Sequence, residues 1–128
     1  MGSTGQSNKV VAVIGASSDP RKFGNRAVRA FRRQGYTVVP INPNEPEVEG
    51  LKAYASVLDV TGPIEMATFY VPPEIGMTVM PEVARKAIPE VWLNPGADSA
   101  ELIRLARSLN IEPIVGCSII GIGENPYV

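Results

Sequence analysis

A turn of small residues follows the first apolar run of the chain, which spans residues 10–14. The turn consists of Gly15, Ala16, Ser17 and Ser18. Small residues let the backbone approach a ligand closely, and the helix expected next directs its free N–H groups and positive dipole end toward the same place. These features are typical of a phosphate-binding turn, so the sequence predicts that the chain binds a nucleotide.

Two cations, Arg21 and Lys22, lie in the loop between this turn and the expected helix. Both could contact a pyrophosphate or an extra ribose phosphate, although a solvated loop with unpaired charges is the other interpretation. The dinucleotide consensus is G-x-G-x-x-G with an acidic residue at the end of the second strand. Here the next glycine after Gly15 is Gly24, and the second expected strand ends in Asn42. Both departures weigh against a nicotinamide or flavin ligand.

The composition removes much familiar catalytic chemistry. The 128 residues include no histidine and one cysteine, so a histidine base, a clustered zinc site and an internal disulfide are all absent. The net charge is −1, from 12 basic and 13 acidic side chains, which does not suggest a nucleic acid partner. No apolar stretch approaches the roughly 20 residues that span a bilayer. We therefore expect a cytoplasmic protein that binds neither nucleic acid nor membrane.

Strand-like and helix-like patterns alternate along the chain. Strands are expected at residues 9–15, 37–41, 66–71, 90–93 and 112–115, and helices at residues 25–34, 74–86 and 99–109. This alternation predicts an α/β fold: a single Rossmann-like, open, mainly parallel five-stranded sheet with helices on both faces. Pro81 is expected to break or restart the second helix. Residues 1–8 are expected to form a flexible tail, and residues 9–128 one domain.

The carboxyl ends of the expected strands carry small, polar and proline residues. Beyond the first turn these are Asn42, Pro43, Val71, Pro72, Asn94, Pro95, Gly96 and Cys117. Ligands of open parallel sheets bind at this edge, where the strand order reverses. Turns also use such residues for their backbone geometry alone, so this composition is consistent with a site without demonstrating one.

Five segments, in this order, resemble the small standalone CoA-binding proteins, which are related to the CoA-binding domain of the succinyl-CoA synthetase α subunit. They are residues 11–17, 35–43, 50–54, 71–74 and 91–96. Cys117 falls where this family commonly has a cysteine, and the family often has Gln where this chain has Asn94. The resemblance extends from Lys9 to Cys117 and implies a Rossmann-like fold with coenzyme A as the ligand.

The resemblance also implies a role for most residues at this edge of the sheet. The assignments are Gly15, Ala16, Ser17 and Ser18 for the pyrophosphate, Lys22 for phosphate charge, Asn42 and Pro43 for the ribose and 3′-phosphate, Val71 and Pro72 for the adenine, and Asn94, Pro95 and Gly96 for the pantetheine arm. These roles agree with the phosphate-binding turn inferred from the residues themselves.

Binding of CoA or an acyl-CoA without catalysis is the predicted function. The related synthetase passes phosphate through a histidine, which this chain lacks. Two alternatives stay open: an NAD(P)-binding oxidoreductase, and a redox or regulatory protein in which Cys117 forms a mixed disulfide with CoA. A buried, unreactive thiol is the other account of Cys117. A homodimer or an unidentified protein partner is also left open.

Overall fold

The computed structural model describes residues 9–128, so the tail expected at residues 1–8 lies outside the described residues. Within residues 9–128, five parallel strands form one sheet in the order β2-β1-β5-β6-β7. They are β1 (Val10–Ile14), β2 (Thr37–Ile41), β5 (Met66–Phe69), β6 (Glu90–Leu93) and β7 (Ile114–Val115). The strand order reverses between β1 and β5, which places the topological switch point there.

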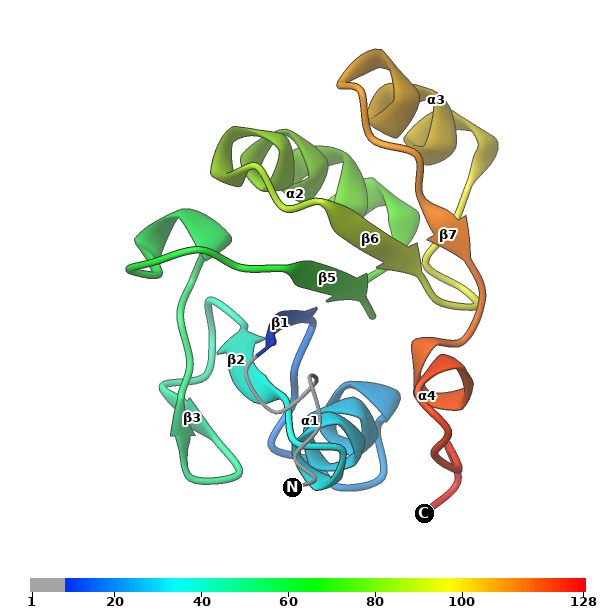
Figure 1. Cartoon of the computed structure of the whole chain (residues 1–128). Coiled ribbons are helices and arrows are strands. Elements are labelled where there is room, and N and C mark those ends of the chain that lie inside the picture. The colour runs from blue at the N-terminus through cyan, green and yellow to red at the C-terminus, as the bar shows by residue number, and fades with distance from the viewer. Residues whose placement is uncertain (1–8) are drawn as a thin grey trace.

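Helices cover both faces of this sheet, as Figure 1 shows. The helices are α1 (Phe23–Arg33), α2 (Pro73–Lys86), α3 (Ala100–Ser108) and α4 (Ser118–Gly121), with a short 3₁₀ helix, η2 (Val57–Asp59). One layer consists of α2 and α3, and the other of α1 and α4 (Figure 1). The predicted fold class is therefore confirmed: a Rossmann-like open parallel sheet between two helical layers.

The first strand explains why the sheet has two cores. Successive side chains of a strand point to opposite faces, and in β1 both faces are apolar. Val11 and Val13 pack among residues of α1 and α4, including Phe31. Ala12 and Ile14 pack on the opposite face with residues of α2, α3 and η2. The unbroken apolar run in the sequence is thus a strand buried on both sides.

The prediction that Pro81 breaks or restarts the second helix is wrong. Pro81 lies inside one continuous helix, α2, although proline has no N–H to donate to the carbonyl four residues earlier. Met80 and Val83 on either side of it are fully buried against the core. Their burial holds the helical backbone through the position where one hydrogen bond is missing.

The ends of several elements differ from the predicted ones. The last strand begins at Ile114 instead of residue 112, because Pro113 has no N–H for the ladder and β7 pairs only with Trp92 and Leu93 of β6. The strand β5 ends at Phe69, two residues earlier than expected. Residues 45–50 were expected to form a loop and residues 51–58 a short extended piece with a helical turn, but Glu47–Val48 (β3) and Leu51–Lys52 (β4) pair as a two-stranded antiparallel sheet. The helix α4 lies in the last dozen residues, for which the residue pattern predicted no clear element.

Candidate functional site

A cavity of about 600 Å³ lies at the carboxyl ends of β1, β2, β5 and β6. It is called the main cavity below, and it is lined by Gly15, Ser17, Lys22, Phe23, Gly24, Asn42, Glu45, Tyr70, Val71, Pro72, Pro95, Gly96 and Ala97. Residues that follow β1 and residues that follow β5 both contribute, so the cavity lies at the switch point. This is the place where open parallel sheets bind their ligands.

Two glycines bring the turn after β1, the neighbouring strand end and α1 into close contact. Gly15 has a φ of +89°, and a Cβ at this position would lie 2.8 Å from the carbonyl oxygen of Tyr70. A Cβ at Gly24 would lie only 2.1 Å from the carbonyl oxygen of Gly15. Gly24 therefore lets α1 pack closely on the turn. The last glycine of the dinucleotide consensus has the same role in dinucleotide-binding proteins.

Two asparagine side chains hold the backbone of the turn. Asn42 Nδ2 donates to the carbonyl oxygen of Ala16 at 2.7 Å. Asn25 Nδ2 donates to the carbonyl oxygen of Ser17 at 2.9 Å, and Asn25 is fully buried at the start of α1. Because both carbonyls are fixed, the turn is preorganised before any ligand arrives. Asn42, which was predicted to line the ribose, thus holds the backbone of the turn in this structure.

The carboxylate of Glu45 lies against the same turn. Its Oε2 accepts hydrogen bonds from the backbone N–H of Ser18 at 3.1 Å and from Ser18 Oγ at 3.0 Å. Asn42 Oδ1 accepts from the N–H of Asn44 at 2.8 Å, which turns the chain after β2 and brings Glu45 to this position. The Glu45 carboxylate therefore already accepts a hydrogen bond from the Ser18 N–H, one of the groups that were predicted to hold the pyrophosphate.

The two predicted cations differ in their surroundings. Lys22 lines the main cavity at the N-terminal end of α1. The side chain of Arg21 is 86% exposed, and its Nη2 lies 2.9 Å from Oδ2 of Asp19. The hydrogen bond from Arg21 lowers the pKa of Asp19 to about 2. Arg21 is therefore paired outside the cavity, and Lys22 supplies the positive charge among the lining residues.

The structure separates the predicted residues into two sets. Those in the main cavity are Gly15, Ser17, Lys22, Asn42, Val71, Pro72, Pro95 and Gly96. Those that do not line it are Ala16, Ser18, Arg21, Pro43, Asn94 and Cys117. The cavity is also lined by Phe23, Glu45, Tyr70 and Ala97, which were not predicted to be site residues. A signal for Glu45 existed, because the dinucleotide consensus places its acidic residue after the second strand, and Glu45 follows β2 by four positions.

Asn94 is buried, with 2% of its surface exposed. Its Nδ2 donates to Thr68 Oγ1 at 2.7 Å and to the carbonyl oxygen of Phe69 at 2.8 Å, while its Oδ1 accepts from the N–H of Ser118 at 2.8 Å. Thr68 Oγ1 and Ser118 Oγ are themselves 2.7 Å apart. The Asn94 amide therefore joins the ends of β5 and β6 to the start of α4.

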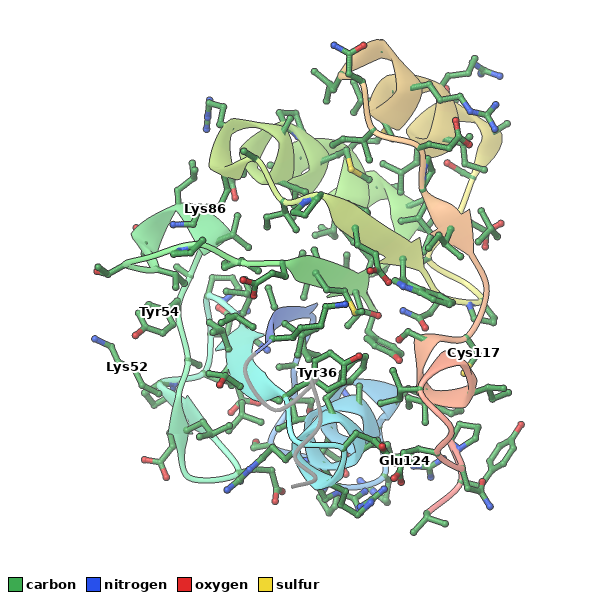
Figure 2. The ribbon with its side chains drawn as sticks, in the orientation of Figure 1. Tyr36, Lys52, Tyr54, Lys86, Cys117 and Glu124 are labelled. Atoms are coloured by element: carbon green, nitrogen blue, oxygen red, sulfur yellow. The ribbon has the colours of Figure 1, made fainter. Side chains whose placement is uncertain are left out.

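A second cavity, of about 230 Å³, adjoins the main one and is called the tail cavity. It is lined by Phe23, Tyr70, Asn94, Pro95, Cys117, Ile120, Pro126 and Tyr127. Cys117 is a partly exposed free thiol just before α4, as Figure 2 shows. Burial raises the pKa of Tyr70, which lines both cavities, to about 12. Its hydroxyl therefore keeps its proton at neutral pH and is 3.2 Å from Ser118 Oγ.

Among residues 9–128, no group of three His, Cys, Asp or Glu side chains is placed to hold a metal ion. In the same range, no helix is both long enough and apolar enough to cross a membrane.

An open parallel sheet with a cavity over its strand ends at the switch point defines a Rossmann-like α/β protein of the ligand-binding type. Residues 9–122 match the family described as the CoA binding domain. The chain belongs to this CoA-binding domain family, which confirms the resemblance found in the sequence.

Similar proteins are of two kinds, long ligases and short chains. Over 123 residues the chain is 31% identical to subunit alpha of the ADP-forming acetate–CoA ligase II of Pyrococcus furiosus, covering 88% of this chain and 27% of the ligase subunit. A conserved hypothetical protein from Pyrococcus furiosus shares 34% identity with a TM-score of 0.82, covering 89% of this chain and 98% of that one. The chain thus spans about a quarter of the ligase subunit.

A solved ligase structure shows the same relation. The dinucleotide forming acetyl-coenzyme A synthetase 1 of Ca. Korarchaeum cryptofilum, in complex with phosphate and ADP, is 29% identical with a TM-score of 0.71. The likeness covers 82% of this chain and 25% of the synthetase. The fold of this chain is therefore shared with one part of a much longer enzyme.

Proposed function

We propose that residues 9–128 form one domain that binds coenzyme A, or an acyl-CoA, in the main cavity and performs no chemistry of its own. The observation that carries the proposal is the position of this cavity at the switch point, beside a preorganised turn, in a chain of the CoA-binding domain family. The size of the cavity, about 600 Å³, is within the usual range for small-molecule and cofactor sites.

In this proposal the pyrophosphate binds at the turn of residues 15–18, where the first turn of α1 adds its helix dipole. The positive charge of Lys22 contacts the phosphates, and the Asn42 side chain holds the backbone of the turn. Val71 and Pro72 offer an apolar wall to the adenine, and Pro95 and Gly96 line the way to the pantetheine arm. Asn94 has a structural role in this proposal, because its hydrogen bonds hold the strand ends that form the cavity walls.

Binding without catalysis is favoured by the residues of the site. Histidine, the side chain that most often exchanges protons near neutral pH, does not occur in the chain. Burial raises the pKa of Tyr70, which lines both cavities, to about 12, so its hydroxyl is not ionised near pH 7 and is no general base there. The ligase relatives are much longer than this chain, so the activity that their names record need not be carried by the part they share.

Calorimetric titration of the protein with CoA, dephospho-CoA and NADH tests this proposal. The protein is first stripped by partial unfolding, because bound CoA can copurify. We expect CoA to bind most tightly and dephospho-CoA more weakly, because the latter lacks the 3′-phosphate. Preference for NADH would favour the oxidoreductase alternative, and failure of all three ligands to bind would overturn the proposal.

Two neighbouring lysine and arginine variants sharpen this test. Lys22→Met removes the cation that lines the cavity, and we expect CoA affinity to fall about tenfold, which corresponds to one lost charge-assisted hydrogen bond. Arg21→Met is the matched control, because Arg21 is exposed and paired with Asp19 outside the cavity. Equal losses in the two variants would mean that the phosphates do not bind beside α1.

A further inference from the structure

The tail cavity adjoins the main cavity. Phe23, Tyr70 and Pro95 line both of them, so the two cavities meet at these three side chains. The two cavities differ in character: the main one contains Lys22 and Glu45, whereas the lining of the tail cavity includes no charged side chain. Its walls are aromatic rings, proline rings, the Ile120 side chain, the Cys117 thiol and Asn94, whose amide is already hydrogen-bonded within the protein.

The outer wall of the tail cavity is held in place by contacts with α1. Glu124 Oε1 accepts from Arg33 Nε at 2.9 Å, and Glu124 Oε2 accepts from Gln34 Nε2 at 2.7 Å. Figure 2 shows Glu124 beside α1, where the chain leaves α4. These bonds fix the segment that leads to Pro126 and Tyr127.

Two further contacts fasten the end of this segment at the cavity itself. Arg26 Nη1 donates to the carbonyl oxygen of Pro126 at 3.2 Å, and the Arg26 guanidinium lies 5.0 Å from the centre of the Phe23 ring. The ring of Tyr127 packs edge-on against Phe23, with 6.2 Å between their centres. The apolar enclosure is thus built by specific long-range contacts between the C-terminal segment and the residues at the start of α1.

We propose that the tail cavity receives the acyl group of a short-chain acyl-CoA, and this rests on the proposed binding of the CoA portion in the main cavity. A volume of about 230 Å³ corresponds to roughly seven water-sized groups, which suits a short acyl chain and not a fatty acyl chain. An uncharged acyl group fits this lining. A terminal carboxylate, as in succinyl-CoA, would be desolvated there without a cation among the lining residues.

Calorimetric titration with CoA, acetyl-CoA, butyryl-CoA and succinyl-CoA tests the acyl site. Each methylene that is fully buried tightens binding by about fourfold, so two further methylenes should make butyryl-CoA roughly fifteenfold tighter than acetyl-CoA. Succinyl-CoA has the same four-carbon acyl skeleton with a carboxylate, and we expect it to lose this advantage. Equal affinities for acetyl-CoA, butyryl-CoA and succinyl-CoA would overturn the proposal.

A charged substitution in the wall locates the effect. Ile120 is 63% exposed, so Ile120→Asp leaves the core intact while it places a carboxylate in the tail cavity. We expect the ratio of butyryl-CoA affinity to free CoA affinity to fall to about one. Leu58→Asp is the matched control: Leu58 is also an exposed leucine-sized residue, at 41%, and lies in η2 away from both cavities. Its ratio should equal that of the unchanged protein.

The outcomes distinguish this inference from the proposed function. If free CoA does not bind, the proposed function fails and the acyl site falls with it. If free CoA binds but the butyryl-CoA ratio is the same in Ile120→Asp and in the unchanged protein, only the acyl site is overturned. A mixed disulfide between CoA and Cys117, seen by mass spectrometry together with no preference for butyryl-CoA, would also overturn the acyl site. The tail cavity would then hold the CoA thiol beside Cys117 and not an acyl group.

Discussion

The main cavity and the tail cavity share a wall but are built in different ways. The main cavity is formed by turns that directly follow β1, β2, β5 and β6, so each wall is a short local motif. The tail cavity depends on contacts between α1 and residues about a hundred positions later, such as Arg26 with Pro126. The first kind of site can be recognised in a sequence, whereas the second exists only once the chain has folded.

The two cavities also differ in what they can attract. The main cavity contains one lysine, the backbone of a glycine turn and an internal carboxylate, Glu45, with which the proposed phosphate ligand would compete. The tail cavity has no charged lining residue, so the proposed acyl group would bind there by apolar burial and shape. Variants that affect both cavities, and then each one separately, should therefore have effects of decreasing size.

The largest effect is expected for Gly24→Ala, which acts on the packing beneath both cavities. A Cβ at this position would lie 2.1 Å from the backbone oxygen of Gly15, so α1 must move away from the turn. We expect a loss of at least about 2 kcal/mol in the free energy of unfolding, together with loss of CoA binding. Denaturant unfolding and calorimetry measure the two.

Gly116→Ala serves as the control for this variant, because its nearest contact would be an ordinary 3.8 Å to the ring of Trp92. If Gly24→Ala were as stable as Gly116→Ala and still bound CoA, the close packing of α1 on the turn would not be needed.

Asn94→Ala should have the next largest effect, because Asn94 joins the ends of β5 and β6 to α4. The substitution leaves the buried N–H of Ser118 without its acceptor and removes two donated hydrogen bonds. We expect the free energy of unfolding to fall by about 1.5 kcal/mol, measured by denaturant titration. The exposed Asn44→Ala should change it by less than about 0.5 kcal/mol, and similar losses in both variants would contradict the buried network.

Glu45→Gln should change the main cavity alone, and in the favourable direction. The variant removes a negative charge that accepts from the Ser18 N–H, where a phosphate oxygen is proposed to bind. Removing repulsion of about 1 kcal/mol should tighten CoA binding roughly fivefold by calorimetry. Glu47→Gln, on the exposed surface of β3, is the control and should change affinity by less than about twofold. Weaker binding in Glu45→Gln would show that the carboxylate contacts the ligand favourably.

The smallest effect concerns the segment that closes the tail cavity, and it depends on pH. Hydrogen bonds from Gln34 and then Arg33 lower the pKa of Glu124 below its ordinary value of 4.5. Because the folded pKa is depressed, the stabilisation from Glu124 is present above the ordinary pKa and is lost as the pH falls through the folded one. We expect the Tyr127 ring resonances in NMR spectra to approach those of an unrestrained tyrosine at acidic pH.

Glu124→Gln should give the released Tyr127 spectrum already at neutral pH, without a large change in overall stability, since the ion pair lies at the surface. Tyr127 resonances that stay unchanged in this variant would mean that the aromatic contact with Phe23 alone holds the segment.

Much of the sheet could be predicted because its strands are short apolar runs that alternate with helical segments along the chain. The strands β2 and β6 begin and end where the pattern predicted, since each is a short, mainly apolar run that is bounded by turn residues. The strand β7 was predicted too long, because Pro113 and the edge position decide where pairing starts. The continuity of α2 through Pro81 was missed, since the compensating burial of Met80 and Val83 comes from the core between α2, α3 and the sheet.

The amino-acid sequence by itself determined the class of fold, the turn of small residues after β1 and the order of the motifs, because these depend on periodicity and on residues adjacent in the chain. The tertiary structure decided which polar side chains remain available to a ligand. Arg21 is paired with Asp19, and the Asn94 amide is hydrogen-bonded to the strand ends. The turn after β2 places the Glu45 carboxylate in the cavity. Such partners are set by distances in space, which residue spacing along the chain does not specify.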